Sequence, residues 1–292
     1  MKTLFVAAGD ISWGSSRLRC YWPARYMNAD VVEARVLNGK DYKVFEPYGA
    51  VVFQKVGIPD VQERLLRDGK QVWLDQCDPT WWFSPGEMRA MVDHCTGVVV
   101  SSQNLGDDFN RWSGMKARLI HDRLEFDHYD RVRTHGQVDP VRFLWHGVSV
   151  NRLVLYGAWV NLHRLAANGH NIALTIMDNE PERAFIPGRE LPIYHVRWDL
   201  AHEVDVATSH DIALLPKYPG PWGVVKSANK DRSAMACGLP FIRGTNYEEM
   251  EALVVDHERR ADLGRRGRQD AETLWGVERS AREWEGLLGE VL

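Results

Sequence analysis

Lys226 and Lys230 stand four residues apart near the middle of residues 211–242, the most informative stretch of the sequence. The residues around them have the composition of a helix start, which offers free backbone N–H groups and a partial positive charge. Two ammonium groups on one face of such a start would favour an anion such as a diphosphate. An ordinary crossover helix with two solvated lysines would show the same pattern.

The elements around the two lysines predict a parallel α/β unit. Residues 211–216 form an apolar run closed by a proline, as in a buried strand, and Gly220 marks the loop that follows. Gly238 and Pro240 then end the helix, and a second strand begins at once. Open parallel sheets bind ligands at the carboxyl ends of their strands, so we expect the lysines at such an edge.

The segment SANKDRSAMACGLPFI resembles the donor-binding segment of GT-B glycosyltransferases, above all family 4, which typically reads K-(S/A)-x-x-K-x-x-E-x-M-A-x-G-x-P. The matching positions are Lys226, Ser227, Lys230, Met235, Ala236, Gly238 and Pro240. The resemblance implies that a nucleotide-sugar donor is held by Lys226, Ser227, Asn229, Lys230 and Ser233.

Two positions depart from the pattern of that family. Ser233 stands where the family usually has a glutamate that binds the donor ribose. Val225 stands where many members carry a second glutamate near the sugar. We therefore expect ribose recognition, and the contacts to the sugar, to differ in detail from the family.

The first loop of the chain is a second candidate site. An apolar run ends at Gly9, and Gly14, Ser15 and Ser16 then form a good helix entry in which either serine could cap. The run GSSRLR resembles the first loop of some family 4 enzymes, which implies that these residues and Arg17 contact donor phosphate or acceptor. A capped helix with surface arginines is the alternative. A proline inside this helix predicts a kink.

Asp75 and Asp78 follow the predicted strand 72–75. Carboxylates at the end of a parallel strand could bind sugar hydroxyls or act as an acceptor base. Aspartates before a proline also cap turns, which is the structural alternative. In the resembled family this region often reads D-x-x-D and borders the acceptor. The aromatic run 81–83, WWF, follows directly and could stack on a sugar or base, or pack inside the protein.

The second half of the chain restarts with a predicted strand, residues 141–145. The resemblance implies that Gly147 and Arg152, in the loop after it, lie near the donor phosphates. It also implies that Trp198, at the end of a later strand, lies beside the nucleotide base. The arginines within residues 259–268 alternate with acidic residues, so we interpret them as a solvated helix face and not as a nucleic-acid patch.

Composition limits the class of protein. The chain has 292 residues, 45% of them apolar and 26% charged, and a net charge of −4, which provides no overall attraction to nucleic acid. Its four cysteines are scattered and form no CxxC pair, which argues against a zinc site or a disulfide framework. No apolar run approaches the ~20 residues of a membrane span. We expect a cytoplasmic protein without a metal site.

We predict an α/β protein with two Rossmann-like, doubly wound domains facing a cleft, the GT-B architecture. The expected domains are residues 1–135 on the acceptor side and residues 141–275 for the nucleotide sugar. The C-terminal helix, within 276–292, is expected to pack back on the first domain.

The predicted function is transfer of a hexose or pentose from a UDP- or GDP-sugar to an acceptor, without metal or bound cofactor. The resemblance to family 4 implies that the configuration of the sugar is retained. Lys230 would stabilise the departing diphosphate, and Asp75 and Asp78 would act on the acceptor side. Three acceptor classes remain open: a glycan, a small metabolite, or a hydroxylated base in DNA. The alternatives are a non-catalytic nucleotide-sugar-binding protein and a nucleotide-sugar epimerase on the same fold.

Overall fold

The computed structural model describes residues 1–37, 42–182 and 191–290, and these fall into two compact units. Unit 1 comprises residues 1–124, 220–228 and 276–292, and unit 2 comprises residues 125–219 and 229–275. The chain therefore passes between the units several times, and one crossing lies between Ala228 and Asn229. In the part of the chain that is described, no helix combines the length and the apolar character needed to cross a membrane.

Unit 1 contains one fully parallel sheet in the order β2-β1-β3-β4-β5-β6. Its strands are β1 (Thr3–Ala7), β2 (Ala29–Glu33), β3 (Ala50–Gln54), β4 (Gln71–Gln76), β5 (Gly97–Val100) and β6 (Arg118–Leu119). The central strands β1, β3 and β4 are buried along their whole length, as expected of a parallel sheet covered on both faces.

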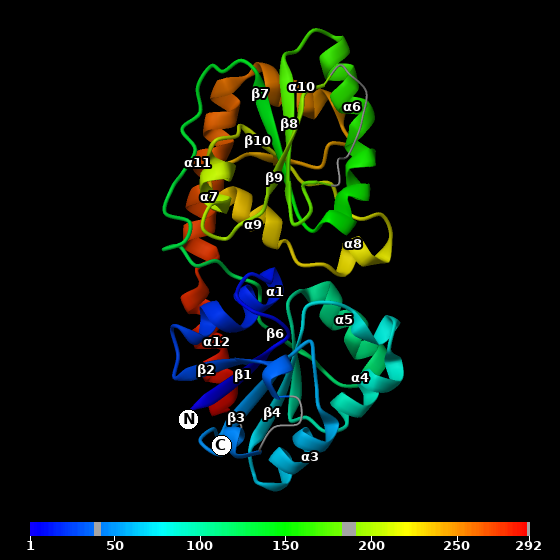
Figure 1. The fold of residues 1–292 in the computed structure, drawn as a ribbon, viewed down its shortest axis with the longest axis vertical. Helices are drawn as coiled ribbons and strands as arrows, with labels where there is room; N and C mark the ends of the chain where they lie inside the picture. Colours follow the sequence, from blue (N-terminus) through cyan, green and yellow to red (C-terminus); the bar gives the residue numbers. More distant parts are fainter. Residues whose placement is uncertain (38–41, 183–190, 291–292) are drawn as a thin grey trace. The chain divides into compact units, whose positions relative to one another are not determined.

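Helices cover both faces of this sheet (Figure 1). One face packs on α3 (Pro59–Arg67), α4 (Pro85–Val92) and α5 (Gln103–Ser113), and the other packs on α12 (Val277–Gly289). Alternate residues of β1 pack into the hydrophobic cores on the two faces of the sheet. Leu4 and Val6 pack toward α3–α5, and the Phe5 ring meets the Trp284 ring of α12 edge-on, with 5.6 Å between the ring centres. Short helical turns complete the unit: η2 (Ala34–Leu37), η3 (Tyr42–Phe45), η4 (Thr80–Trp82) and α8 (Pro221–Val225).

Unit 2 contains a second parallel sheet, in the order β11-β10-β7-β8-β9. The strands are β7 (Val141–His146), β8 (Ile172–Asp178), β9 (Ile193–Arg197), β10 (Ile212–Leu214) and β11 (Phe241–Ile242). One face packs on α6 (Tyr156–Ala167), which follows the 3₁₀ turn η5 (Ser149–Leu155), and on α10 (Tyr247–Val255). Helices α7 (Glu203–Thr208), α9 (Asn229–Ala236) and α11 (His257–Leu274) lie on the other side of the sheet (Figure 1).

The predicted α/β class with two parallel sheets is confirmed. Two local expectations are wrong. The helix expected to open at Lys226 begins at Asn229, because the preceding residues form the separate helix α8 and Lys226 itself is extended (φ −65°, ψ 144°). Neither serine of the first loop caps a helix: the N-cap residue of α1 (Gly14–Ser16) is Trp13, and it makes no side-chain cap.

The kink expected at the proline in the first helix takes the form of a π-helical turn. Helix α1 continues through the π turn η1 (Arg17–Tyr21) into α2 (Trp22–Ala24), in which Pro23 is the second residue. A proline cannot donate a hydrogen bond to the preceding turn and its ring crowds that turn, and a wider π turn there reduces the conflict. The π turn carries Arg17 and Arg19, which both belong to the candidate site of unit 1.

Candidate functional site

The candidate site of unit 2 lies where the order of its sheet reverses. From β7 the chain continues to β8 and β9 on one side, whereas β10 pairs with the other side of β7. Such a reversal leaves a crevice at the carboxyl ends of the two strands, where open α/β sheets bind ligands. His146 and Gly147 stand at the carboxyl end of β7, and Leu215 follows β10.

Lys230, the second residue of α9, reaches into this edge. Its Nζ donates a hydrogen bond to the carbonyl oxygen of His146 (2.7 Å) and lies 5.1 Å from the centre of the Trp145 ring. These contacts place the ammonium group against a strand-end carbonyl and an aromatic face at the edge of the sheet.

Gly147 is required by the position of that ammonium group. A Cβ atom at residue 147 would lie 2.6 Å from Lys230 Nζ and 2.9 Å from the Trp145 ring, closer than real Cβ contacts. Any side chain here would displace the lysine or the buried tryptophan. The predicted pairing of a glycine with the basic residue of this site therefore has a steric basis.

We expect Gly147→Ala to weaken anion binding more than folding. The added methyl must move the flexible end of Lys230 and press on Trp145, and overpacking of this kind costs about 1–3 kcal/mol of stability. Calorimetric titration with UDP should show at least a tenfold weaker affinity in a protein that still unfolds cooperatively. Gly157→Ala is the control, since a Cβ there meets no atom within 4 Å. Unchanged UDP affinity in Gly147→Ala would contradict this role.

The start of α9 is organised by its own side chains. Asn229 Oδ1 accepts a hydrogen bond from the backbone N–H of Lys230 (2.8 Å). Ser233 donates from its Oγ to the carbonyl of Asn229 (3.1 Å) and accepts a hydrogen bond from the Tyr129 hydroxyl (3.1 Å). Asn229, Lys230 and Ser233 are therefore brought together in unit 2, whereas Lys226 and Ser227 belong to unit 1.

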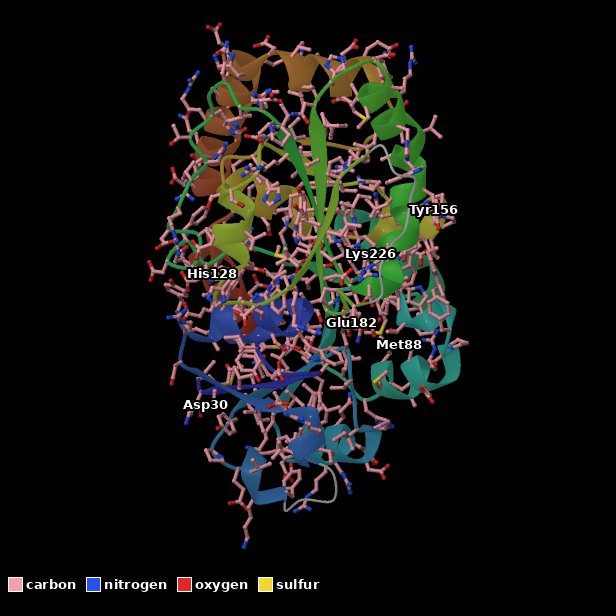
Figure 2. The ribbon with its side chains drawn as sticks, turned by 45° about the horizontal axis from the view of Figure 1, so that its top comes forward. Asp30, Met88, His128, Tyr156, Glu182 and Lys226 are labelled. Carbon is pink, nitrogen blue, oxygen red and sulfur yellow. The ribbon has the colours of Figure 1, made fainter. Side chains whose placement is uncertain are left out.

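Glu203 was not predicted as a site residue, although it contacts the predicted residue Trp198. The carboxylate is buried and accepts hydrogen bonds from Trp198 Nε1 (2.6 Å) and the Tyr129 hydroxyl (3.4 Å), and His128 Nε2 lies 2.8 Å away (His128 is labelled in Figure 2). The cavity between this cluster and Ser233 measures only about 20 Å³, room for about one water. The cluster thus fixes Trp198 at the end of β9.

Arg152 forms an ion pair with the carboxylate of Asp178. It lies in η5, is buried, and donates from Nη2 to Asp178 Oδ1 (2.7 Å) at the carboxyl end of β8, with a second contact from its Nε. Asp178 Oδ1 also accepts from the backbone N–H of Glu180 (2.9 Å). The pair ties the loop after β7 to the loop after β8, so the guanidinium of Arg152 positions this edge of the sheet.

In unit 1, Asp78 follows the carboxyl end of β4 and lies between two lysines. Its carboxylate pairs with Lys55 through one oxygen and with Lys226 through the other; Lys226 is labelled in Figure 2. Lys55 follows β3 and adopts a left-handed backbone (φ +61°), a strained conformation for a residue with a side chain. This strain places a second ammonium group at the sheet edge, which the sequence alone did not indicate.

The two lysines keep Asp78 ionised. Burial by itself raises the pKa of this carboxyl, but the charges and hydrogen bonds of Lys226 and Lys55 outweigh it and bring the pKa below 3.8. A carboxyl with a lowered pKa stabilises the fold above the pKa of the unfolded state, about 3.9, and this stabilisation is lost as the pH falls through the folded pKa.

We expect Asp78→Asn to remove an acid-dependent part of the stability of the protein. The gap between wild-type and variant free energies of unfolding should be constant above about pH 5 and shrink as the pH falls below about 4. Urea denaturation from pH 3 to pH 7 measures it. Asp93→Asn, at an exposed aspartate of unit 1, is the control and should show no such change. A pH-independent gap for Asp78→Asn would contradict the assignment.

Asp75 differs from the expectation that both carboxylates face outward. It is fully buried and accepts hydrogen bonds from Arg19, including one from Nε at 2.9 Å. Arg19 also contacts Asp122 (3.2 Å), whose other oxygen accepts a hydrogen bond from Ser227. Burial raises the pKa of Asp75 and Arg19 opposes this rise. The network connects η1, β4 and the segment before α9, so Asp75 holds these elements together and does not face a ligand.

The first loop is closed by its own polar residues. Ser16 is buried, accepts a hydrogen bond from the backbone N–H of Gly9 (3.1 Å) and donates to Gln54 Oε1 (3.2 Å). Arg17 donates to the carbonyls of Ile11 and Ser12, both at 3.2 Å. Gly14 is exposed and Ser15 is half-buried. The closed loop lies between the carboxyl ends of β1 and β3, where the strand order of unit 1 reverses.

Acidic and sulfur-containing side chains do not gather into a metal site. Within residues 1–37, 42–182 and 191–290, no group of three or more histidine, cysteine, aspartate or glutamate side chains could hold an ion. Burial raises the pKa of the thiols of Cys77 and Cys237 to about 12, so both are protonated at neutral pH.

No protein-family model matches the sequence, and no curated protein matches it. Solved structures share the fold along the whole chain. The structure of Anabaena HepE in complex with UDP and glucose has a TM-score of 0.71 and 12% identity, over 99% of this chain and 100% of that chain.

Two further structures show the same extent of similarity. An α-glucosyltransferase in complex with UDP and a 13-mer DNA containing a central A:G mismatch has a TM-score of 0.70 and 12% identity, over 98% of this chain and 99% of that chain. A glycosyltransferase from Rickettsia africae has a TM-score of 0.65 and 8% identity, over 99% and 98%. At such low identities the similarity establishes a shared two-domain α/β fold.

Proposed function

We propose that the chain is a glycosyltransferase of the GT-B type that moves a sugar from a UDP-sugar to an acceptor. The observation that carries the proposal is the Lys230 ammonium group, held beside Gly147 at the reversal point of the unit 2 sheet. Fold neighbours of full length support it, because they were solved with UDP and glucose, or with UDP-glucose and DNA containing an abasic site.

In this proposal unit 2 binds the donor. The diphosphate lies against Lys230 and the start of α9, with Asn229 and Ser233 beside it. Trp198, fixed by Glu203, contacts the base, and the Arg152–Asp178 pair holds the strand ends in place. Ser233 is too short to replace a ribose-binding carboxylate, so the ribose contacts differ from those of the resembled family. Lys226, Ser227 and the first loop with Gly14, Ser15, Ser16 and Arg17 are proposed as additional donor contacts.

The chemistry requires one bond to form and one to break at the anomeric carbon. The bond from that carbon to the β-phosphate oxygen breaks, and its electron pair leaves with UDP. An acceptor hydroxyl oxygen forms the new glycosidic bond, and its proton passes to the departing diphosphate oxygen. Negative charge grows on the diphosphate during this step, and a fixed ammonium group with helix-start N–H groups stabilises it. Lys230 is assigned this role.

The acceptor side of the reaction is assigned to unit 1. Asp78 is ionised at neutral pH because Lys55 and Lys226 flank it, so its carboxylate can accept a hydrogen bond from an acceptor hydroxyl. Asp75 supports this edge through Arg19 and does not reach solvent. Retention of configuration is carried over from the resembled family, and the acceptor class stays open among a glycan, a small metabolite and a hydroxylated base in DNA.

A second candidate is a non-catalytic nucleotide-sugar-binding protein. The specific observation in its favour is Val225, which stands where the resembled family has a sugar-contacting glutamate and is buried in the core of unit 1 (5% exposed). A binder would bind UDP and UDP-sugar with similar affinity and release no UDP. An enzyme would convert the sugar nucleotide, if only slowly to water.

Calorimetric titration with UDP, GDP and UDP-glucose tests the donor class. The proposal predicts that UDP binds in a 1:1 ratio and more tightly than GDP. If neither UDP nor GDP binds, the assignment of a donor site to unit 2 is contradicted. Tighter binding of GDP would keep the enzyme class and change the donor.

A further inference from the structure

Three aromatic side chains form a cluster on unit 1 that the proposed function leaves without a role. Trp82 ends η4 and Phe83 follows it; both are exposed, Phe83 to 71%. Trp222 lies in α8 and is half-buried. The Trp222 ring meets Phe83 at 5.6 Å and Trp82 at 6.1 Å, at interplanar angles of 60° and 64°. Edge-to-face packing of this kind places the edge of one ring against the face of another, and it leaves the opposite ring faces uncovered by the cluster itself. We call these three residues the aromatic platform.

The platform is built on fixed supports. Helix α8 is tied to α5 by hydrogen bonds from Asn104 to the Val224 carbonyl (3.0 Å) and from Ser102 to the Val225 carbonyl (2.6 Å). Trp82 Nε1 donates to Asp108 Oδ2 (2.7 Å), also on α5. The third aromatic residue of the WWF run, Trp81, is buried against Phe109 and belongs to the core. Exposed rings with anchored backbones and indole nitrogens are pre-organised for a ligand.

The platform continues directly to the proposed acceptor carboxylate. Lys226 Nζ lies 5.3 Å from the centre of the Trp222 ring and pairs with Asp78. A ligand ring that stacks on Trp222 would therefore be separated from Asp78 only by the side chain of Lys226. The platform is thus part of the same face of unit 1 as the group assigned to the acceptor.

Charge distinguishes the classes of ligand that an aromatic platform could take. The cations beside it have carboxylate partners: Lys226 and Lys55 pair with Asp78, and Arg111 pairs with Asp108. Glu87, on α4, is exposed and follows Phe83 closely in sequence, and exposed Asp107 on α5 stands next to Asp108, which binds Trp82 Nε1. Phosphate groups of nucleic acid or of anionic lipids need unpaired cations, and carboxylates repel them. A neutral saccharide suits both kinds of group on this surface. Its C–H face packs on the aromatic rings, and its hydroxyls donate hydrogen bonds to the carboxylates.

We infer that the aromatic platform binds a saccharide, which is the acceptor of the transfer. The acceptor role rests on the proposed function, whereas saccharide binding itself does not. The ligand class is therefore a neutral glycan with at least one pyranose ring, and the base of a DNA acceptor is excluded from this surface.

A glycan array probed with fluorescently labelled protein tests the inference without a donor. We expect binding to neutral glycans, and at least about tenfold weaker binding for Trp222→Ala and Phe83→Ala, as loss of an aromatic contact implies. Tyr194→Ala, an exposed aromatic residue of unit 2, should bind as the wild type does. Phe83 is so exposed that its variant should fold normally, which thermal melting and UDP titration check.

The outcomes separate this inference from the proposed function. Failure to bind any glycan, or equal glycan binding by the wild type and the platform variants, would overturn the inference. The proposed donor site would be unaffected, because the UDP titration tests it separately. Platform-dependent binding of a single-stranded oligonucleotide, or of vesicles of phosphatidylcholine with phosphatidylglycerol, would also overturn it. Platform-dependent glycan binding without any nucleotide binding would support the inference as a binding site and remove the proposed transfer.

Discussion

Lys230→Ala should lose most of the affinity for UDP and lower the rate of sugar transfer by about 10²–10³, the range found when one charge-stabilising donor is removed. The ammonium group sits at the sheet edge and binds the diphosphate both before and during departure, when its charge is highest. A thermal-shift titration measures the first effect, since UDP at about 100 times its Kd stabilises the folded state by about 2.7 kcal/mol. In the variant this stabilisation should disappear.

Lys116→Ala is the matched control for Lys230→Ala. Lys116 is exposed in unit 1, before β6 and therefore at the amino end of the sheet, away from the strand ends assigned to the ligand. The control should retain the UDP-induced shift. The donor assignment would be contradicted if Lys230→Ala kept the shift, or if both variants lost it equally.

Arg19→Met should strongly destabilise the protein. Arg19 is 1% exposed, and its removal leaves the buried carboxylates Asp75 and Asp122 without their cation. Breaking a buried ion pair by removing one partner typically costs about 3–5 kcal/mol. Urea denaturation monitored by far-UV circular dichroism should show this loss. The effect should be larger than that of any surface substitution in unit 1.

A double substitution distinguishes charge from packing at this position. In Arg19→Met with Asp75→Asn, one uncompensated carboxylate has been removed, so part of the lost stability should return. Equal stability of the single and double variants would show that packing of the guanidinium, and not its charge, carries the effect. Loss of UDP binding in a still folded Arg19→Met protein would contradict a purely supporting role.

The sheets could be predicted from the sequence because each central strand contains an apolar run. β1, β3 and β4 are buried on both faces, and such runs between glycine-rich loops have few other interpretations. Helix α8 could not be predicted in the same way. Its sequence, PWGVV, has low helix propensity, and it is held by Ser102 and Asn104 from more than a hundred residues earlier in the chain.

Side-chain environments were the least predictable part of the site. Asp75 and Asp78 are the same residue type and are close in sequence, yet their environments differ. Asp75 is buried in an ion pair with Arg19, whereas Asp78 pairs with two lysines at the edge of the sheet. Glu203 gave no local signal, because two of its three partners, His128 and Tyr129, are more than seventy positions away in the chain. The resemblance singled out residues 226–233 as one segment, but the separation of Lys226 from the helix that begins at Asn229 depends on the fold.

The most direct test of the account is release of UDP from sugar nucleotides. Purified protein is incubated with UDP-glucose, UDP-galactose or UDP-N-acetylglucosamine, with and without the glycans that bind the array, and UDP and the anomeric proton of the product are followed by NMR. The account predicts UDP release from one donor, faster with a platform-binding glycan, and none in Lys230→Ala. UDP that binds in a 1:1 ratio while every sugar nucleotide stays intact would contradict a transferase and leave a nucleotide-sugar-binding protein.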